Sequence, residues 1–121
     1  MAARIRTFKD LVVWQKAMEL SVQIYHLTKK YPTDEKFGLT VETRKTSRSI
    51  PYNIAEGHKR STTADYIRFL SIAAGSASEL ETQLLLCRRL KSLGSEEPHS
   101  VLADIEELSK MLASLISKLR D

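Results

Sequence analysis

The chain is poor in residues that interrupt regular structure. Its 121 residues include four glycines, three prolines and one cysteine, Cys87. A single cysteine excludes a disulfide within the chain, and few turn residues favour long elements. No apolar run approaches the ~20 residues of a membrane span, and no hydrophobic signal segment follows the first residues. We therefore expect one cytoplasmic domain, residues 1–121, with Cys87 as a small buried hydrophobe.

Four segments have helical periodicity, and no segment is convincing as a strand. Apolar residues recur at steps of three or four over about residues 10–30, 34–57, 62–93 and 97–119. Start and stop signals lie at the joins: Pro32, the N-cap Thr33, Gly57, the capping box 62–65 and the start signal 95–98. The expected buried stripe of the first helix is Leu11, Trp14, Met18, Val22 and Tyr25. Those of the other three are Leu39, Thr43, Thr46, Ile50 and Ile54; Tyr66, Phe69, Leu70, Ala73, Ala77, Leu80, Leu84 and Cys87; and Val101, Ile105, Leu108, Leu112, Leu115 and Leu119.

These patterns predict an all-α fold, an antiparallel up-down-up-down four-helix bundle, because connections of a few residues favour antiparallel neighbours. A second set of apolar residues lies off the main stripes. We interpret it as a subunit interface of a homo-oligomer, the alternative being ordinary exposed aliphatic residues. Its members are Val12, Val13, Leu20, Ile24, Ile67, Ile72, Leu85, Leu86, Leu102 and Ile116.

Residues 49–57 break several local rules within the second helix. Pro51 removes a backbone hydrogen bond at a cost of roughly 3 kcal/mol, which predicts a kink or close contact. Gly75, inside the third helix, predicts a close helix approach. We expect the two helices to cross tightly near Pro51 and Gly75, with a polar cluster fixing their register. Its expected members are Ser49, Asn53 and Glu56 on one helix and Ser76, Glu79 and Gln83 on the other.

The sequence offers no pattern for catalysis. A di-iron bundle needs two Glu-x-x-His motifs, and the one match, at residues 96–99, contains a proline. There is no nucleophile elbow and no glycine-rich phosphate loop. Glu56 and Glu79 are more readily explained as polar groups that satisfy each other than as an acid–base pair. We expect no enzyme activity, no metal or other cofactor and no small-molecule substrate.

Positive charge is concentrated in the first half of the chain. Residues 1–60 hold 12 Lys and Arg against 6 Asp and Glu, a net charge of +6, whereas residues 96–121 have a net charge of −3. Lys45, Arg48, Tyr52 and Lys59 fall at i, i+3, i+7 and i+14, on one side of the second helix and its exit. Such a stripe can neutralise phosphates while an aromatic ring stacks on a base. The alternative is a solvated helix face or ion pairs between subunits. The candidate nucleic-acid residues are Arg44, Lys45, Arg48, Tyr52, Lys59 and Arg60, with Arg4, Arg6 and Lys9 as a basic arm.

The chain resembles the four-helix-bundle proteins encoded by intervening sequences in bacterial 23S rRNA genes. Fragments of the resemblance lie in order over nearly the whole chain, at residues 8–17, 31–32, 37–39, 49–57, 72–76 and 79–81. It implies a ring, most simply a homopentamer, and a role connected with RNA. A related family, the accessory protein of diversity-generating retroelements, is a similar pentamer that works with a reverse transcriptase. One departure is Glu42, which stands where the family commonly has glutamine in a Gln-x-Arg-Arg run.

Two hypotheses follow from the sequence. The first is a non-enzymatic, oligomeric protein that associates with RNA or another nucleic acid through the basic residues of its first half. The second is a protein–protein interaction scaffold in which the same basic face contacts subunits or partners.

Overall fold

The computed structural model describes residues 4–90 and 99–121, and all regular structure in these ranges is helical. Four long helices are preceded and linked by short turns. The elements are the 3-10 turn η1 (Phe8–Asp10), α1 (Val12–Thr28), the turns η2 (Thr33–Glu35) and η3 (Lys36–Thr40), α2 (Val41–His58), α3 (Thr63–Arg89) and α4 (His99–Arg120).

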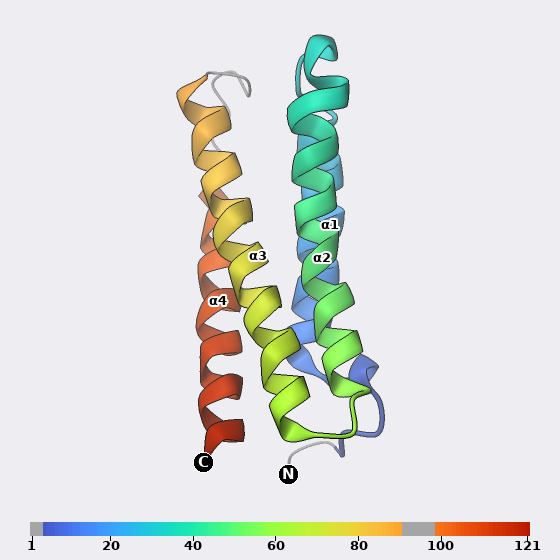
Figure 1. Cartoon of the computed structure of the whole chain (residues 1–121). Helices are drawn as coiled ribbons and strands as arrows, with labels where there is room; N and C mark the ends of the chain where they lie inside the picture. Colours follow the sequence, from blue (N-terminus) through green and yellow to red (C-terminus); the bar gives the residue numbers. More distant parts are fainter. Residues whose placement is uncertain (1–3, 91–98) are drawn as a thin grey trace.

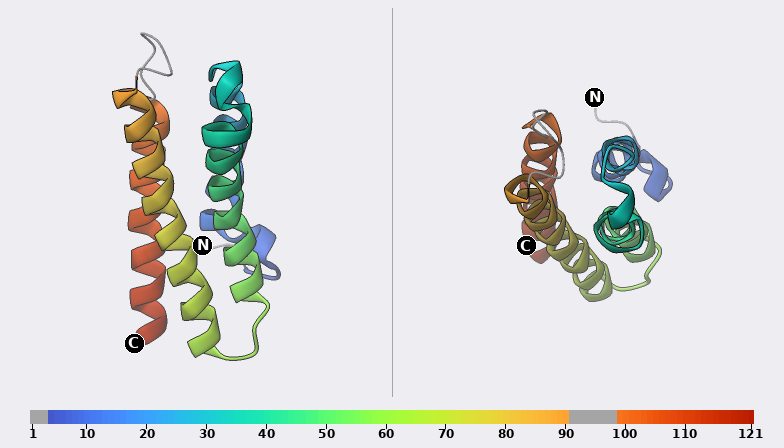
Figure 2. Two further views of the ribbon diagram at one scale, coloured as in Figure 1. Left: turned by 45° about the horizontal axis from the view of Figure 1, so that its top comes forward. Right: turned by 90° about the horizontal axis from the view of Figure 1, so that it is seen from above.

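The four helices run alternately up and down and form an antiparallel bundle (Figure 1). Each helix packs against the next in sequence, and α4 returns to pack against α1. Viewed along the bundle, α1 lies beside α2 and α3 beside α4 (Figure 2). An ion pair joins Lys16 of α1 to Glu107 of α4 at 2.9 Å. This topology is the one that the sequence predicts.

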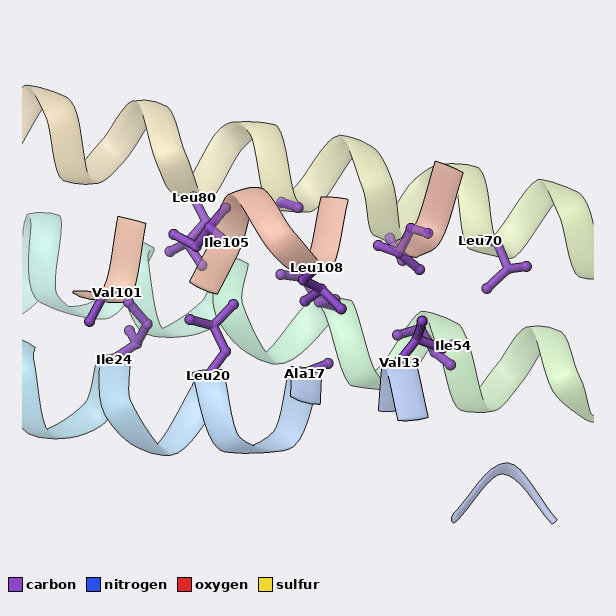
Figure 3. Packing of buried hydrophobic residues seen from close by; sticks show 14 of the residues in the cluster. Val13, Ala17, Leu20, Ile24, Ile54, Leu70, Leu80, Val101, Ile105 and Leu108 are labelled. Atoms are coloured by element: carbon purple, nitrogen blue, oxygen red, sulfur yellow. The ribbon is translucent and has the colours of Figure 1, made fainter. Parts of the chain in front are cut away.

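The core is a continuous aliphatic cluster with contributions from all four helices (Figure 3). The predicted stripe of α4 is buried from Val101 to Leu112, and Leu115 and Leu119 pack partly buried against the same core. On α3 the predicted stripe is buried from Leu70 to Cys87. A smaller cluster contains Tyr31 and Cys87, and burial raises the pKa of the Cys87 thiol. The interpretation of Cys87 as a buried hydrophobe is confirmed.

The predicted stripe of the first helix is only partly correct: Leu11 and Trp14 pack partly buried against the core, but its other three members do not. The side chains that point into the bundle come from Val13, Ala17, Leu20 and Ile24 (Figure 3). Met18, Val22 and Tyr25, the expected core residues, are instead 42%, 55% and 48% exposed. Because Val13, Leu20 and Ile24, like Ile116 of α4, belong to the core, they are also removed from the predicted subunit interface.

The second helix starts later than predicted. Residues 33–40 form the turns η2 and η3, and the regular helix begins at Val41. The break lies at Gly38, whose φ of −105° and ψ of −106° are not helical. The predicted kink at Pro51 is not where the helical path breaks, since α2 continues through Pro51 to His58. Thr33 therefore begins a 3-10 turn instead of capping α2.

Pro51 has a specific effect on the contact between α1 and α2. Its ring nitrogen carries no hydrogen, so the carbonyl of Ser47, four residues earlier, receives no helical hydrogen bond from it. That carbonyl instead accepts a hydrogen bond of 3.1 Å from the hydroxyl of Ser21 on α1. Pro51 is itself buried. The proline thus exchanges a bond within α2 for a bond between helices.

The close approach of α2 and α3 occurs at Gly57, and the prediction of a tight contact at Gly75 is wrong. A Cβ atom added to Gly57 would lie 2.8 Å from the Cβ atom of Phe69, so α3 passes where a side chain would stand. A Cβ atom added to Gly75 would meet nothing within 4 Å. Gly57 was expected to end the helix as a C′ residue, yet it lies within the last turn of α2.

The predicted start of α3 and the predicted end of α4 are confirmed, whereas α3 ends earlier than predicted. Thr62 caps α3, with its hydroxyl accepting a hydrogen bond of 3.1 Å from the backbone N–H of Asp65. α3 ends at Arg89, whereas the prediction extended it to residue 93. Residues 91–93 of that predicted extension lie outside the described residues. The start signal at residues 95–98 also lies outside them.

The exchange at Pro51 predicts a non-additive pair of substitutions. Ser21→Ala should lower the free energy of unfolding by about 1 kcal/mol, because it leaves the carbonyl of Ser47 without either partner. In a Pro51→Ala background the restored N–H can bond to that carbonyl, and the same Ser21→Ala change should cost little. Urea unfolding of the four proteins measures this coupling. Equal costs in both backgrounds would show that the hydrogen bond is not the compensating interaction.

Candidate nucleic-acid interface

The predicted polar cluster is only partly assembled. The hydroxyl of Ser49 donates to Ser76 at 2.5 Å, which links α2 to α3 as expected. Asn53 donates to the backbone oxygen of Ser49 in its own helix, at 2.7 Å. Glu56 and Glu79 do not join the cluster: both are exposed, and Glu56 pairs with Arg60 at 2.7 Å.

Gln83 makes the buried polar contact between α2 and α3. Its side chain is 5% exposed, and its amide nitrogen donates to the hydroxyl of Thr46 at 2.9 Å. The same amide lies 3.4 Å from a carboxylate oxygen of Glu42. The buried polar contact between α2 and α3 therefore lies one to two turns nearer the start of α2 than predicted. A buried amide with one good partner fixes the register of the two helices.

The basic residues predicted to form one stripe separate onto two sides of α2. Lys45 lines a groove between α2 and α3, where Glu42 and Glu79 lie beside it. Arg48 and Tyr52 line a different groove, between α1 and α2. The division follows from helical geometry, because residues on the flank of a helix are shared between its two neighbours. The carboxylates beside Lys45 make the α2–α3 groove the weaker candidate for binding phosphate.

The α1–α2 groove has a mostly apolar floor and a cationic wall, and its volume is about 270 Å³. It contains no acidic side chain. Tyr25 and Tyr52 are 48% and 64% exposed, so both rings are accessible from solvent. The groove is lined by Met18, Ser21, Val22, Tyr25, Arg44, Ser47, Arg48, Pro51 and Tyr52.

Arg44 is held in place by α1. Its Nε donates to the hydroxyl of Thr28 at 2.7 Å, and one Nη donates to the backbone oxygen of Tyr25 at 3.3 Å. The guanidinium carbon lies 4.2 Å from the centre of the Tyr25 ring. Since a guanidinium has five N–H donors, these contacts leave three for another acceptor. Arg44 is therefore a structural link between α1 and α2 that has N–H donors to spare.

The cations around Tyr25 have no carboxylate partner among the described residues. The ammonium of Lys29 lies 5.0 Å from the centre of the Tyr25 ring, on which Arg44 also packs. A second ring contacted by two cations, Phe69, provides an internal comparison. Its partners are Arg60 and Arg68, and both pair with carboxylates, at 2.7 Å and 3.5 Å. The positive charge near Tyr25 is thus uncompensated, and that near Phe69 is neutralised.

The remaining predicted residues lie away from the α1–α2 groove. Lys59 is exposed directly after the end of α2, and Arg60 is occupied by Glu56 and Phe69. In the predicted basic arm, Arg4, Arg6 and Lys9 are exposed, and the turn η1 is closed by a capping box between Thr7 and Asp10.

Sequence reasoning missed the contribution of α1 to this surface. Tyr25, Met18 and Val22 were assigned to the core, and Lys29 was not among the candidate nucleic-acid residues. The available signal was that apolar residues surround the first helix, with Val13, Ala17, Leu20 and Ile24 as a competing stripe. Whichever of the two stripes is buried, the residues of the other stripe are left exposed on the surface of the helix.

Two further features are absent from residues 4–90 and 99–121. Within these ranges, no three His, Cys, Asp or Glu side chains are grouped so that they could hold a metal ion. None of the helices described there is long and apolar enough to cross a membrane.

The helices and the cationic groove define an all-helical bundle protein without a recognised catalytic centre in its described residues. The chain belongs to the 23S rRNA-intervening sequence protein family, whose model matches residues 9–114. A similar solved structure is a protein of unknown function from the S23 ribosomal protein family of Bacteroides thetaiotaomicron. It is 33% identical, with a TM-score of 0.80 over 88% of this chain and 96% of that chain. No curated protein matches the chain.

The geometry predicts different structural roles for the two arginines of the groove. Arg44→Ala should lower the free energy of unfolding by about 1–2 kcal/mol, because it removes two hydrogen bonds and a ring contact. Arg48→Ala should change it by less than about 0.5 kcal/mol, since Arg48 is exposed and makes no such contacts. Urea unfolding compares the two variants, which lose the same charge. Equal destabilisation would contradict the structural role of Arg44.

Proposed function

We propose that this protein is a non-enzymatic, homo-oligomeric nucleic-acid-binding protein, with RNA as its ligand. The observation that carries the proposal is the group of cations along α1 and α2 that has no carboxylate partner in the described structure. Uncompensated positive charge attracts polyanions, because binding releases the counterions condensed on their phosphates. The family description, which refers to 23S rRNA, agrees with such a ligand.

The first test of this proposal is the salt dependence of RNA binding. Three phosphate contacts by Lys29, Arg44 and Arg48 would give a slope of log K against log salt of about −2 on a single strand. Fluorescence anisotropy with a labelled single-stranded RNA over a salt series measures the slope. Arg48→Gln should reduce its size by about 0.7 without loss of stability. Negligible or salt-independent binding would contradict nucleic-acid binding.

The outer face of α3 supports the oligomeric part of the proposal. Ile72 and Leu86 are 44% and 47% exposed on this face, although both are large aliphatic residues. Gly75 lies between them in the sequence, and among the described residues no neighbour explains its lack of a side chain. A glycine inside an exposed helix costs about 1 kcal/mol relative to alanine. A second copy packed closely against α3 would account for that cost.

Two measurements test the assembly. Light scattering at micromolar concentration should give a multiple of the 13.7 kDa chain mass, five-fold for the ring that the resemblance implies. In an isolated bundle, Gly75→Ala would raise stability by about 1 kcal/mol. At a subunit contact the added methyl group should instead weaken the assembly, and Gly75→Leu should weaken it further. A native mass of one chain would contradict the proposal.

The second candidate function is a protein–protein scaffold without direct nucleic-acid binding. The apolar floor of the α1–α2 groove favours it, because tyrosine, arginine and methionine are enriched at protein interfaces. The salt series separates the two functions. A scaffold should remain oligomeric while RNA binding stays weak and insensitive to the charge of Arg48.

A further inference from the structure

We propose that the α1–α2 groove binds one unpaired nucleobase of a single-stranded RNA, with the base against Tyr52 and the flanking phosphates on Arg48 and Arg44. This inference rests on the nucleic-acid-binding function proposed above and adds to it the class of RNA and the site. Duplex RNA presents phosphates to a basic surface and keeps its bases stacked, whereas a single strand can place a base in a groove.

The floor of the groove suits the face of a base. Tyr52 is 64% exposed, and none of the ring contacts among the described residues involves it, so its ring is available for stacking. Met18, Val22 and Pro51 supply apolar contact beneath it. The groove volume of about 270 Å³ is slightly below the ~300–1,000 Å³ of typical small-ligand pockets. It therefore matches one base better than a larger ligand.

The cations are placed to follow the backbone of the strand away from the base. Arg44 lines the α1–α2 groove and also a second hollow, of about 220 Å³, at the end of α1. That hollow contains Lys29 and the hydroxyl-bearing residues Thr33 and Thr40, and it has no acidic side chain. Arg44 thus connects two adjacent cationic hollows. A strand with a base in the first can lay its next phosphates across the second.

Charge favours RNA over a second copy of the chain as the occupant. Three other exposed cations in the described structure have carboxylates near them: Lys16 pairs with Glu107, Arg60 pairs with Glu56, and Lys45 lies beside Glu42. The groove lacks any such partner, so its ligand must supply the negative charge. A nucleotide supplies an aromatic face and an anion together, in the two chemistries that line the groove.

The experiment compares two labelled single-stranded RNAs of equal length by fluorescence anisotropy. One has a mixed sequence, and the other carries abasic sites that keep the phosphates and remove bases. The native protein should bind the intact strand about five-fold or more tightly than the abasic strand. Tyr52→Ala should remove that preference by weakening binding to the intact strand alone, and Tyr52→Phe, which keeps the ring, should retain it.

A matched pair of charge variants locates the phosphate contact. Arg48→Gln and Lys45→Gln remove one positive charge each, within one turn of α2, but only Arg48 lines the α1–α2 groove. Arg48→Gln should weaken binding of the intact strand at least about three-fold more than Lys45→Gln. Equal losses would show that general attraction to the basic half of the chain suffices.

The outcomes distinguish this inference from the function on which it rests. Salt-dependent binding with no preference for the intact strand, or with no effect of Tyr52→Ala, overturns the base site and leaves nucleic-acid binding in place. No binding of either strand overturns both. Light scattering on Tyr52→Ala completes the test: a fall in mass relative to the native assembly assigns the groove to a second copy of the chain and overturns the base site.

Discussion

The hydrogen bond between Ser21 and the carbonyl of Ser47 ties the first two helices together and shapes the surface between them. It exists because Pro51 withholds the backbone donor that this carbonyl would otherwise receive. All three residues line the α1–α2 groove, so the interaction that joins the helices also fixes its floor. Arg44 adds a second link by bonding to Thr28 and to the backbone of Tyr25. These two links therefore join the helices that form the groove.

Helical periodicity predicted the parts of the fold in which one apolar stripe stands alone. On α4 the stripe of Val101, Ile105, Leu108 and Leu112 is buried as predicted, and the one off-stripe residue that joins the buried core, Ile116, continues it by a step of four. On α1 apolar residues occur on every side, so periodicity allowed two stripes. The buried one contains Ala17, which contributes little hydrophobicity but lets neighbouring helices approach. Packing between helices decided the orientation of α1, and no local pattern contains that information.

The candidate site was predictable only in the residues of α2. Arg44, Arg48 and Tyr52 could be selected because charge and aromatic character are visible in the sequence. Tyr25 and Lys29 could not, because their exposure depends on the orientation of α1. The sequence also did not reveal which carboxylate lies near which cation. Arg60 pairs with a residue one turn away, whereas Lys45 lies beside carboxylates on two helices. Net charge counts cations, but affinity for an anion depends on those left unpaired.

Lys29 and Arg44, which have no carboxylate partner among the described residues, have an electrostatic cost. Lys29 and Arg44 approach the same ring, and like charges so placed repel each other unless an anion lies nearby. The chain neutralises a comparable pair at Phe69 with Glu56 and Asp65, so the fold can supply carboxylates where they help stability. Among the residues that the structure describes, it supplies none to the lining of the α1–α2 groove. The cation–π contacts with Tyr25 offset part of the repulsion, and a bound phosphate would offset the remainder. Arg44 keeps its two hydrogen bonds and its ring contact in the free protein, and a bound anion would add to these contacts by relieving the repulsion, which is why we place the proposed function on this surface.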